Sequence, residues 1–514
     1  MRMSSIVLVA LLATASPAWT QVLERPDAAS VGARSMAPVP DGARGRQRRE
    51  FLTMFARAYF PGRSGQVMVV PRAGEMITER DPNYGFMHGS PWDDDVRIPL
   101  LFYGPGFIRP GAWLDAVGQQ DVAPTLATVL GVAPAATMAG RSLPVLAPGA
   151  GRPRAVLLLV LDAGRRDYFD RHADRMPTLS RLRREGAWFD NARIDYLPTL
   201  TSVGHATIAT GADPRVHGLA ANNLFNRTTG RPQGAYANLS PHELMALSIS
   251  DVWNLATDGQ AVIIAQGGAD RAVASLAGHG SCLVNGRPVI MASYSASTGR
   301  WVTNPDCYRL PDSIAALDVR PLWEEVDGSW MGHDVGSPTA VRSSAIFQRF
   351  EGDALVASLE QEPVGADEIP DLILVNVKAP DYVSHRFGTD SEEMLAELAE
   401  LDRQVARALD VLDAKTGSRY VVAVTADHGM PSPPGPAHTH YNDDIVDLIH
   451  ERFDASERRV VTYYGDPANA QIYMDVERLA SLGHRLEDVA AFLETLPFIE
   501  AAFTEDEVRR SVVP

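Results

Sequence analysis

Aspartate and histidine recur together in this sequence directly after short apolar runs, a pattern that can bind a metal ion. Three such runs end in these residues, which are Asp162 after the first, Asp381 and His385 after the second, and Asp427 and His428 after the third. Carboxylate and imidazole are both ligands of Zn²⁺, at about 2.0–2.2 Å. A single aspartate at a strand end is more often a helix cap, but three such ends, two of them with an Asp–His pair, favour a metal centre.

A hydroxyl that could act as a nucleophile lies in the Thr- and Gly-rich stretch 198–211, where Thr201 comes four residues before His205. Beside a metal ion, a hydroxyl at a helix start can be deprotonated and attack phosphorus, while the backbone N–H groups hold the anion. Taken alone, the stretch is typical of an ordinary helix N-terminus. Together with the Asp–His pairs it indicates chemistry on a phosphate ester.

These residues need a scaffold that brings distant segments to one place, and the apolar pattern predicts one. Short runs of branched apolar residues predict buried parallel strands at 66–70, 98–104, 155–162, 372–377 and 420–425. In an open α/β sheet, ligands gather beyond the carboxyl ends of the strands. Strand and helix signals alternate after residue 155, so we expect an α/β fold with a mostly parallel sheet and helices on both faces.

The segments between these strands predict helices, a linker and a cap. Residues 121–131 begin with aspartate and stop at glycine, and 391–412 carry apolar residues at helical spacing, so both predict helices. The Pro- and Gly-rich stretch 147–154 is the clearest linker. Residues 236–350 are rich in Gly, Ser, Asn and Trp with weak periodicity, and we expect them to form an inserted cap outside the sheet.

The composition excludes several classes of protein. The chain has 514 residues with 64 acidic and 47 basic side chains, a formal net charge of −17. This balance argues against a protein that binds nucleic acid or an anionic membrane through bulk charge. A chain of this length buries a large core, so its two cysteines are not a structural framework. The only lysines in the sequence are Lys378 and Lys415, so a catalytic lysine has few places to come from.

The N-terminus predicts export. Residues 1–20 have a basic start, an apolar stretch and small residues near its end, as a secretory signal peptide does, although a buried N-terminal helix is the alternative. No later stretch approaches the ~20 uninterrupted apolar residues of a membrane span. We therefore expect a periplasmic or secreted protein. In that oxidising setting Cys282 and Cys307 can form a disulfide, and two unpaired buried cysteines are the alternative.

Together these motifs resemble the alkaline phosphatase superfamily, in its branch of type I phosphodiesterases, nucleotide pyrophosphatases and threonine-dependent bacterial alkaline phosphatases. The resemblance covers most of the chain and implies two Zn²⁺ ions. It implies that Thr201 is the nucleophile and that Asn222, or its neighbour Asn223, holds a phosphoryl oxygen. For one zinc ion it implies the ligands Asp162, Thr201, Asp427 and His428, and for the other Asp381, His385 and one further histidine.

That further histidine is out of its usual order. In the family it follows the Asp-His-Gly motif in a Gly-x-His-Gly-Ser-Pro context, but here the match is His88, in Met-His-Gly-Ser-Pro. Residues 51–146 therefore resemble the family's C-terminal portion moved to the front, a circular permutation with its junction at 147–154 and the remaining catalytic domain at 155–514. The competing source, Ala-His-Thr-His ending at His440, lacks the surrounding strand pattern.

The residues that should bind the substrate depart from the family pattern. Monoesterases of this branch carry a Lys-x-Arg pair that binds the phosphate oxygens; Arg271 matches the arginine, but Ala269 stands where the lysine belongs. Lys378, three residues before Asp381, is either a replacement or a solvent-facing lysine at a strand end. The resemblance implies hydrolysis of phosphomonoesters through a phosphothreonine. The alternatives are a phosphodiesterase or nucleotide pyrophosphatase, and a metal-stabilised binding protein that has lost catalysis.

Overall fold

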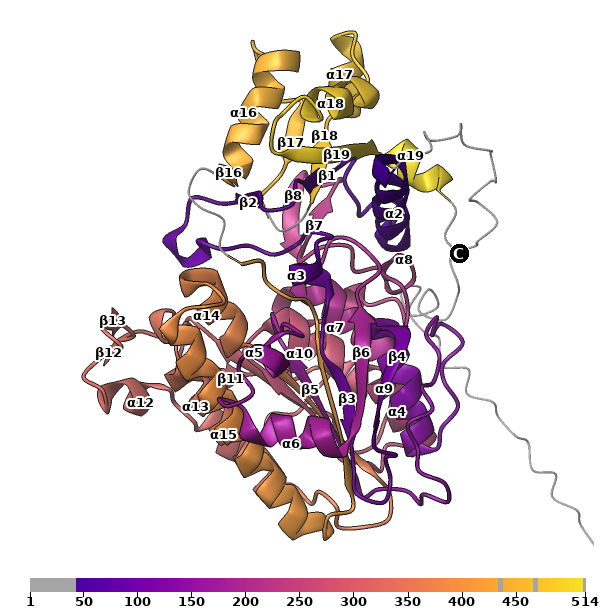
Figure 1. Cartoon of the computed structure of the whole chain (residues 1–514), viewed down its shortest axis with the longest axis vertical. Coiled ribbons are helices and arrows are strands. Elements are labelled where there is room, and N and C mark those ends of the chain that lie inside the picture. Colours follow the sequence, from indigo (N-terminus) through magenta and orange to yellow (C-terminus); the bar gives the residue numbers. More distant parts are fainter. Residues whose placement is uncertain (1–42, 433–437, 466–469, 512–514) are drawn as a thin grey trace, which may run out of the picture.

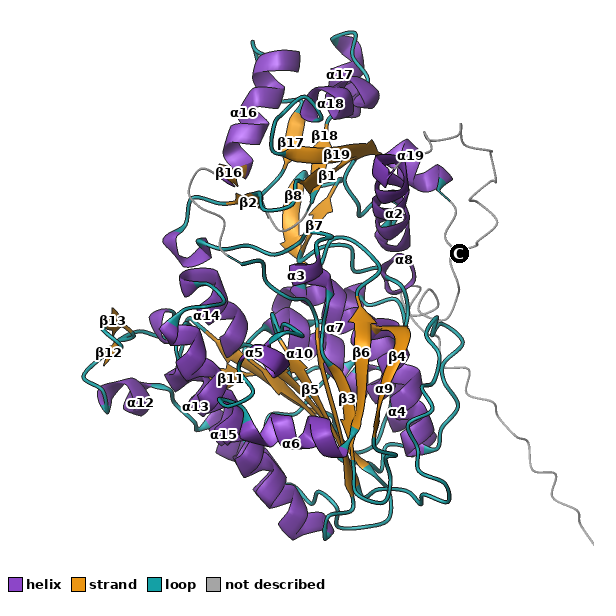
Figure 2. Cartoon of the chain, in the orientation of Figure 1, coloured by secondary structure: helices purple, strands orange, loops and turns teal. Residues whose placement is uncertain are grey.

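The computed structural model describes residues 43–432, 438–465 and 470–511, and the predicted signal peptide at 1–20 lies outside them. Within these residues the chain forms a large sheet flanked by helices and a smaller sheet at one end of the molecule (Figures 1 and 2). No helix in the described ranges is both long and apolar enough to cross a bilayer.

The large sheet has nine strands, most of them parallel. From one edge to the other they are β11 (Arg300–Val302), β10 (Ile290–Ser295), β9 (Ile263–Gly267), β14 (Asp371–Val377), β5 (Ala155–Leu161), β15 (Tyr420–Ala426), β3 (Leu100–Tyr103), β6 (Ala187–Arg193) and β4 (Gly111–Gly118). Within this sheet, β11 and β3 run against their neighbours and the other strands share one direction. The predicted mostly parallel α/β sheet is confirmed.

Helices cover both faces of this sheet because its central strands are apolar on both faces. All seven residues of β5 are buried. Val156, Leu158 and Val160 belong to one hydrophobic core and the alternating Leu157 and Leu159 to a second. The first core includes α4 (Val122–Leu130), α7 (Thr201–Thr210), α9 (Ile249–Ala256) and α10 (Asp270–Ala277), and the second includes α6 (Pro177–Glu185), α13 (Ala345–Gln361) and α15 (Glu392–Thr416). The helices predicted at 121–131 and 391–412 are α4 and α15.

The smaller sheet joins the two ends of the described chain. Its four strands lie in the order β17 (Val461–Tyr463), β18 (Gln471–Met474), β1 (Val67–Pro71) and β19 (Ile499–Thr504). Its apolar core includes residues of α16 (Asn442–Phe453), α17 (Val476–Ser481) and α18 (Leu486–Leu493). Beside it, α2 (Ala43–Ala58) lies against α19 (Glu505–Arg510), and the rings of Phe55 and Phe503 are 5.9 Å apart.

Three expectations about the strands are wrong. The run 66–70 is not a parallel strand, because β1 pairs antiparallel with β18 and with β19 in the smaller sheet. The run 98–104 lies in the large sheet, but β3 is antiparallel to β15 and β6. An apolar run reports burial and not direction, so neither partner could be predicted.

The third correction concerns residues 236–350, which do not lie wholly outside the sheet. They supply the strands β9, β10 and β11, which extend it beyond β14. The apolar run of β9 is short because Gln266 interrupts it, and that amide is buried, donating to the Glu351 carbonyl at 3.0 Å. Within the same region Cys282 and Cys307 form a disulfide, with Cα atoms 4.9 Å apart.

The remaining elements are short. The helices are α3 (Asp93–Val96), α5 (Tyr168–Arg171), α8 (Pro214–His217), α11 (Asp312–Ala315), α12 (Arg320–Glu324) and α14 (Ala379–Phe387). The strand pairs are β2 (Met76–Thr78) with β16 (Thr439–Tyr441), β7 (Asn223–Asn226) with β8 (Arg231–Gly234), and β12 (Ser329–Trp330) with β13 (His333–Asp334).

Candidate metal centre and active site

Three neighbouring strands of the large sheet end side by side, and polar residues follow all three. In the register of the sheet, the last residue of β5 is opposite the last residues of β14 and β15. The chain continues from these strands into Asp162, Lys378 and Asp427, all fully buried. One helical turn along α14, Asp381 and His385 lie on the same face because they are four residues apart.

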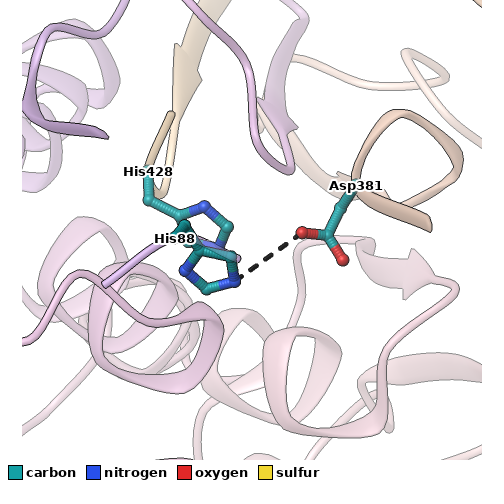
Figure 3. Close-up of side chains that lie close together, drawn as sticks. All are labelled: His88, Asp381 and His428. Carbon is teal, nitrogen blue, oxygen red and sulfur yellow. Dashed lines mark ion pairs between the residues drawn. The ribbon is translucent and has the colours of Figure 1, made fainter. Parts of the chain in front are cut away.

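One cluster gathers around Asp381. Its Oδ1 atom lies 3.3 Å from Nε2 of His385 and 3.8 Å from Nε2 of His88, which comes from the loop before α3 (Figure 3). This carboxylate oxygen is buried and accepts no hydrogen bond. A buried oxygen that faces two imidazole nitrogens and has no partner of its own suits a bound cation.

A second cluster lies directly beside the first. Nε2 of His428 is 3.3 Å from Oδ2 of Asp427 and 3.5 Å from Oδ1 of Asp162. Oδ2 of Asp427 is also buried and accepts no hydrogen bond. The ring of His428 stacks on that of His88 with centroids 3.6 Å apart, so the two clusters share a boundary (Figure 3). His88, Asp381 and His428, and likewise Asp162, Asp427 and His428, offer ligand atoms within 4.8 Å of one another.

The three histidines are held in the form that binds metals. Each uses Nδ1 to donate to a backbone carbonyl: His88 to Thr199 at 2.7 Å, His385 to Phe86 at 2.6 Å and His428 to Gly429 at 2.9 Å. In a neutral ring this leaves Nε2 without a proton, as a metal ligand must be. Burial, together with the charges of His428 and His385, holds the pKa of His88 well below its usual value. Burial also lowers the pKa of His428, to about 3.

The pKa values of the carboxylates Asp427 and Asp381 are shifted in opposite directions. Burial first, and then the nearby charge of Asp162, raise the pKa of Asp427 to about 7. Burial would also raise the pKa of Asp381, but the positive charge that His385 carries when protonated, and that of Lys378, outweigh it and hold that pKa well below its ordinary value. A cation beside Asp427 would relieve the repulsion between the carboxylates.

Thr201 brings a hydroxyl to the boundary of the two clusters. It is the first residue of α7 and is fully buried. Its Oγ1 atom lies 3.5 Å from Nε2 of His428, and it accepts from Nζ of Lys378 at 3.3 Å and from Nη2 of Arg271 at 3.4 Å. Oδ1 of Asn222 accepts the N–H of Ser202 at 3.0 Å, so this amide lies against the same helix start.

A cavity of about 290 Å³ reaches the first cluster. Its walls include His88, His385, Asn222 and Arg271. Asn223, the alternative to Asn222, also lines it. Every predicted site residue therefore lies in the two clusters, at the helix start or on the cavity wall.

Comparison with known proteins identifies the family. The family model "Type I phosphodiesterase / nucleotide pyrophosphatase" matches residues 156–497, two thirds of the chain. The chain belongs to this family. The alkaline phosphatase PafA of Elizabethkingia meningoseptica is 26% identical over 421 residues, which cover 71% of this chain and 77% of PafA. The alkaline phosphatase PhoV of Synechococcus elongatus is 27% identical over 331 residues, covering 55% of this chain and 60% of PhoV.

The fold agrees with this membership. The crystal structure of PafA superimposes with a TM-score of 0.57 and 23% identity, over 67% of this chain and 76% of PafA. The chain is thus a phosphoric ester hydrolase of the alkaline phosphatase superfamily, in the branch that contains PafA.

His440, the alternative to His88 as a metal ligand, lies outside the two clusters. His440 contacts Oε2 of Glu75 at 2.8 Å and stacks on Phe498, and it is in neither metal-binding cluster of the described residues. His205 belongs to neither group: its Nδ1 donates to the Thr201 carbonyl at 2.9 Å, one turn earlier in α7, and lies 3.2 Å from Oδ2 of Asp427 without a hydrogen bond to it.

Two residues that support the site were not predicted from the sequence. Nδ2 of Asn376 donates to Oδ2 of Asp162 at 2.8 Å. Glu351, on α13, accepts the backbone N–H groups of Lys378 and Ala379 at 3.1–3.2 Å. Asn376 did leave a signal, since it is the one amide in the otherwise apolar run of β14. The role of Glu351 left none, because its partners are backbone atoms.

Proposed function

We propose that this hydrolase is an exported two-zinc phosphomonoesterase that acts through a phosphothreonine at Thr201. The observation that carries the proposal is the position of the Thr201 hydroxyl, at a helix N-terminus and at the boundary of two clusters whose imidazoles bind backbone carbonyls through Nδ1 and direct Nε2 at carboxylates. Two buried carboxylate oxygens without partners, on Asp381 and Asp427, fit a cation in each cluster. The disulfide is consistent with an oxidising compartment, and the signal-like residues 1–20 with export.

Seven residues of the chain would hold the two ions. One ion would bind Asp162, Asp427, His428 and Thr201, and the other Asp381, His385 and His88. When bound, a zinc pair supplies Lewis acidity at the attacking and the leaving oxygen and lowers the pKa of bound water. A set of nitrogen and oxygen ligands with several imidazoles suits zinc better than magnesium or calcium, which prefer oxygen ligands.

The residues of the chain then account for a two-step displacement. Oγ1 of Thr201 forms a bond to phosphorus as the ester bond breaks, and the departing alcohol takes the bonding electron pair and, overall, the threonine proton. A water oxygen next bonds to phosphorus, the Thr201 Oγ1–P bond breaks, and the threonine regains a proton from that water. Arg271, 3.4 Å from Oγ1, binds a phosphoryl oxygen in both steps.

We further propose that the catalytic domain is circularly permuted. The family match begins at residue 156, after the 147–154 linker, while His88 from the segment 51–146 lies in the metal cluster. That segment also supplies β3, between β15 and β6 in the sheet, and β1, between β18 and β19. A separate appended domain would have no such strands inside both sheets.

A phosphodiesterase is the second candidate, because Ala269 stands where monoesterases of this branch have a lysine. Turnover of two substrates with one leaving group, p-nitrophenyl phosphate and methyl p-nitrophenyl phosphate, separates these activities. We expect zinc-loaded protein to prefer the monoester. A preference for the diester would establish the second candidate, and bound zinc without turnover of either would indicate a binding protein.

The nucleophile is tested by Thr201→Ala, with Thr201→Ser as its control. We expect the alanine variant to keep its fold and lose at least about 10³-fold in kcat/KM, while the serine variant retains part of the activity. Acid quench during turnover of ³²P-labelled monoester, followed by peptide mapping, should place the label on Thr201. Labelling of another residue, or an alanine variant as active as the serine variant, would refute the assignment.

A further inference from the structure

The side chain of Lys378 is buried against the reacting atoms rather than exposed at a strand end. Its Nζ lies 2.9 Å from Oδ1 of Asp162, 2.5 Å from Oδ2 of Asp381 and 3.3 Å from Oγ1 of Thr201. An ammonium has three N–H donors. Two of them are satisfied by the carboxylates, and the third is left for the hydroxyl that attacks phosphorus.

The lysine leaves one carboxylate oxygen for a metal ion in each cluster, on Asp381 and on Asp427. At Asp381 it contacts Oδ2, whereas the oxygen that faces His88 and His385 is Oδ1. At Asp162 it contacts Oδ1, which also lies 3.5 Å from Nε2 of His428, and Oδ2 is held by Asn376. The ammonium therefore lies between the two clusters and leaves the unpartnered oxygens of Asp381 and Asp427 accessible to cations.

The backbone fixes where this ammonium lies. The carboxylate of Glu351 accepts the N–H groups of Lys378 and Ala379. The Nζ atom also lies 5.2 Å from the ring centroid of Tyr382, a distance at which an aromatic face attracts a cation. A side chain held at both ends is preorganised to bind an anion.

Lys378 lies next to the position where the family lysine is missing. A Cβ atom placed on Gly268 would come within 2.7 Å of the Lys378 Cβ, so the loop after β9 is in close contact with residue 378. Ala269 follows in that loop, with its N–H donated to Oδ1 of Asn376 at 3.2 Å. Two residues further on, Arg271 reaches Thr201 Oγ1 from the first turn of α10.

We propose that Lys378 is a catalytic residue whose third N–H passes from Oγ1 of Thr201 to a phosphoryl oxygen once Oγ1 has bonded to phosphorus, so that Lys378 and Arg271 bind the phosphoryl group together. Lys378 would then supply, from the end of β14, the cation that Ala269 cannot supply. This inference rests on the proposed function. A phosphomonoester carries close to two negative charges near neutral pH, whereas a diester carries one. Two fixed cations at the attacking oxygen stabilise the more highly charged phosphoryl group more strongly, so Lys378 makes the enzyme select monoesters.

The test compares two substrates in the zinc-loaded full chain. Lys378→Met removes the charge and keeps the length of the side chain. We expect kcat/KM for p-nitrophenyl phosphate to fall about 10²-fold, the size of effect seen when one donor to a transition-state oxyanion is removed. For methyl p-nitrophenyl phosphate we expect a fall of less than about fivefold, with two zinc ions still bound per chain.

A matched control and a relocation of the lysine complete the test. Lys415, the other lysine, donates to three backbone carbonyls between residues 359 and 362, so Lys415→Met should leave the monoester-to-diester ratio unchanged. Adding Ala269→Lys to the Lys378→Met variant should restore monoester turnover at least about tenfold. An equal fall for both substrates, or loss of zinc on Lys378→Met, would overturn the inference.

A further variant remains informative if Lys378→Met does not fold. Ala269→Lys in the otherwise unchanged chain should raise monoester kcat/KM by less than about threefold, because the cation is already present; a gain above about tenfold would contradict the inference. Failure of the proposed function looks different, since wild-type protein would then bind zinc and turn over no phosphate ester.

Discussion

Two clusters of histidine and carboxylate in this molecule have similar composition and opposite character. In the cluster of His88, His385 and Asp381, each imidazole donates through Nδ1 to a backbone carbonyl, and Oδ1 of Asp381 accepts no hydrogen bond. In the other cluster, His438 and His440 bind the two oxygens of Glu75, at 3.0 and 2.8 Å. The cluster around Asp381 can bind a cation, whereas the polar atoms of the cluster around Glu75 already contact one another.

The difference lies in what surrounds each imidazole. In the cluster around Asp381, the backbone carbonyls of Thr199 and Phe86 accept from Nδ1 of the two histidines, which directs each Nε2 towards the buried carboxylate. The cluster around Glu75 lies where β16 pairs with β2, so its side chains join two neighbouring segments. Histidines near a carboxylate indicate a metal centre when their Nε2 atoms and the carboxylate oxygens converge without partners. A completed hydrogen-bond network indicates a structural contact.

The largest effect on zinc content and activity should come from removing a histidine of the Asp381 cluster, compared with removing one that binds Glu75. His88→Ala should remove about one zinc ion per chain and lower kcat/KM by at least about 10³-fold, because the ligand set loses a member. His440→Ala should retain both ions and most of the activity. Metal content by mass spectrometry and monoester kinetics check both variants.

The opposite result would reassign the ligand. If the His88 variant kept two ions and the His440 variant lost one, the metal site would include the β16 strand. The permuted order proposed for the domain would then lose its main support.

This contrast also shows what the sequence could and could not predict about the site. Asp162, Asp427 and His428 were predictable because each directly follows a run apolar enough to be a buried strand, and strand direction then places them together. His88 was predictable from a local motif, Met-His-Gly-Ser-Pro. The contact of Lys378 with Thr201 was not, because nothing in a sequence states which way a residue at a strand end points.

The strands of the fold were also predictable only in part. Strands that are mostly apolar and buried over their whole length, such as β5 and β14, were identified within a residue or two of their ends. The strands β9 to β11 were missed because Gln266 and the polar residues near it interrupt the apolar pattern, and their burial depends on side-chain partners such as Ser358 on α13. Strand direction for β1 and β3 depended on partners more than 80 residues away in the sequence.

A third histidine–carboxylate pair, His279 with Asp251, differs from the Asp381 cluster in the direction of its histidine pKa shift. His279 contacts Asp251 through Nδ1 at 2.8 Å and the Leu244 carbonyl through Nε2 at 3.1 Å, so both nitrogens face acceptors, which favours the cationic ring. Burial would lower the pKa of His279, but the charge of Asp251 outweighs burial and raises it above its usual value. This is the reverse of His88, whose pKa is lowered.

The stability of the fold should therefore depend on this pair in a defined direction. A raised pKa means that the folded state binds the proton more tightly, so the stabilisation is full below about pH 6.5 and decreases as pH rises through the folded pKa. His279→Gln should cost ~3 kcal/mol below pH 6.5, because the buried carboxylate loses its partner, and the cost should shrink at higher pH. Urea unfolding from pH 5 to 9 measures the difference, and a cost that grows with pH would contradict a cationic His279.

A smaller effect should follow from removing the amide that holds a metal ligand from behind. Asn376→Ala removes the hydrogen bond to Oδ2 of Asp162, and second partners of this kind contribute about 10- to 100-fold to metal affinity. Zinc titration against a competing chelator measures the change. Asn442→Ala is the matched control, because this buried amide donates to the Tyr464 carbonyl at 2.8 Å in the smaller-sheet region; equal losses of zinc affinity in both variants would show a general loss of stability.

The smallest effect should come from Glu75→Gln, which breaks the satisfied cluster itself. His438 has 56% and His440 has 23% of its side chain exposed, so solvent weakens both contacts and the variant should lose no more than about 1 kcal/mol of unfolding free energy. Zinc content and monoester kcat/KM should stay as in the wild type, because neither histidine contributes a nitrogen to the two metal clusters of the described residues. Loss of a zinc ion from this variant would place His440 in the metal centre. The distinction between an open cluster and a satisfied one, on which the assignment of His88 depends, would then fail.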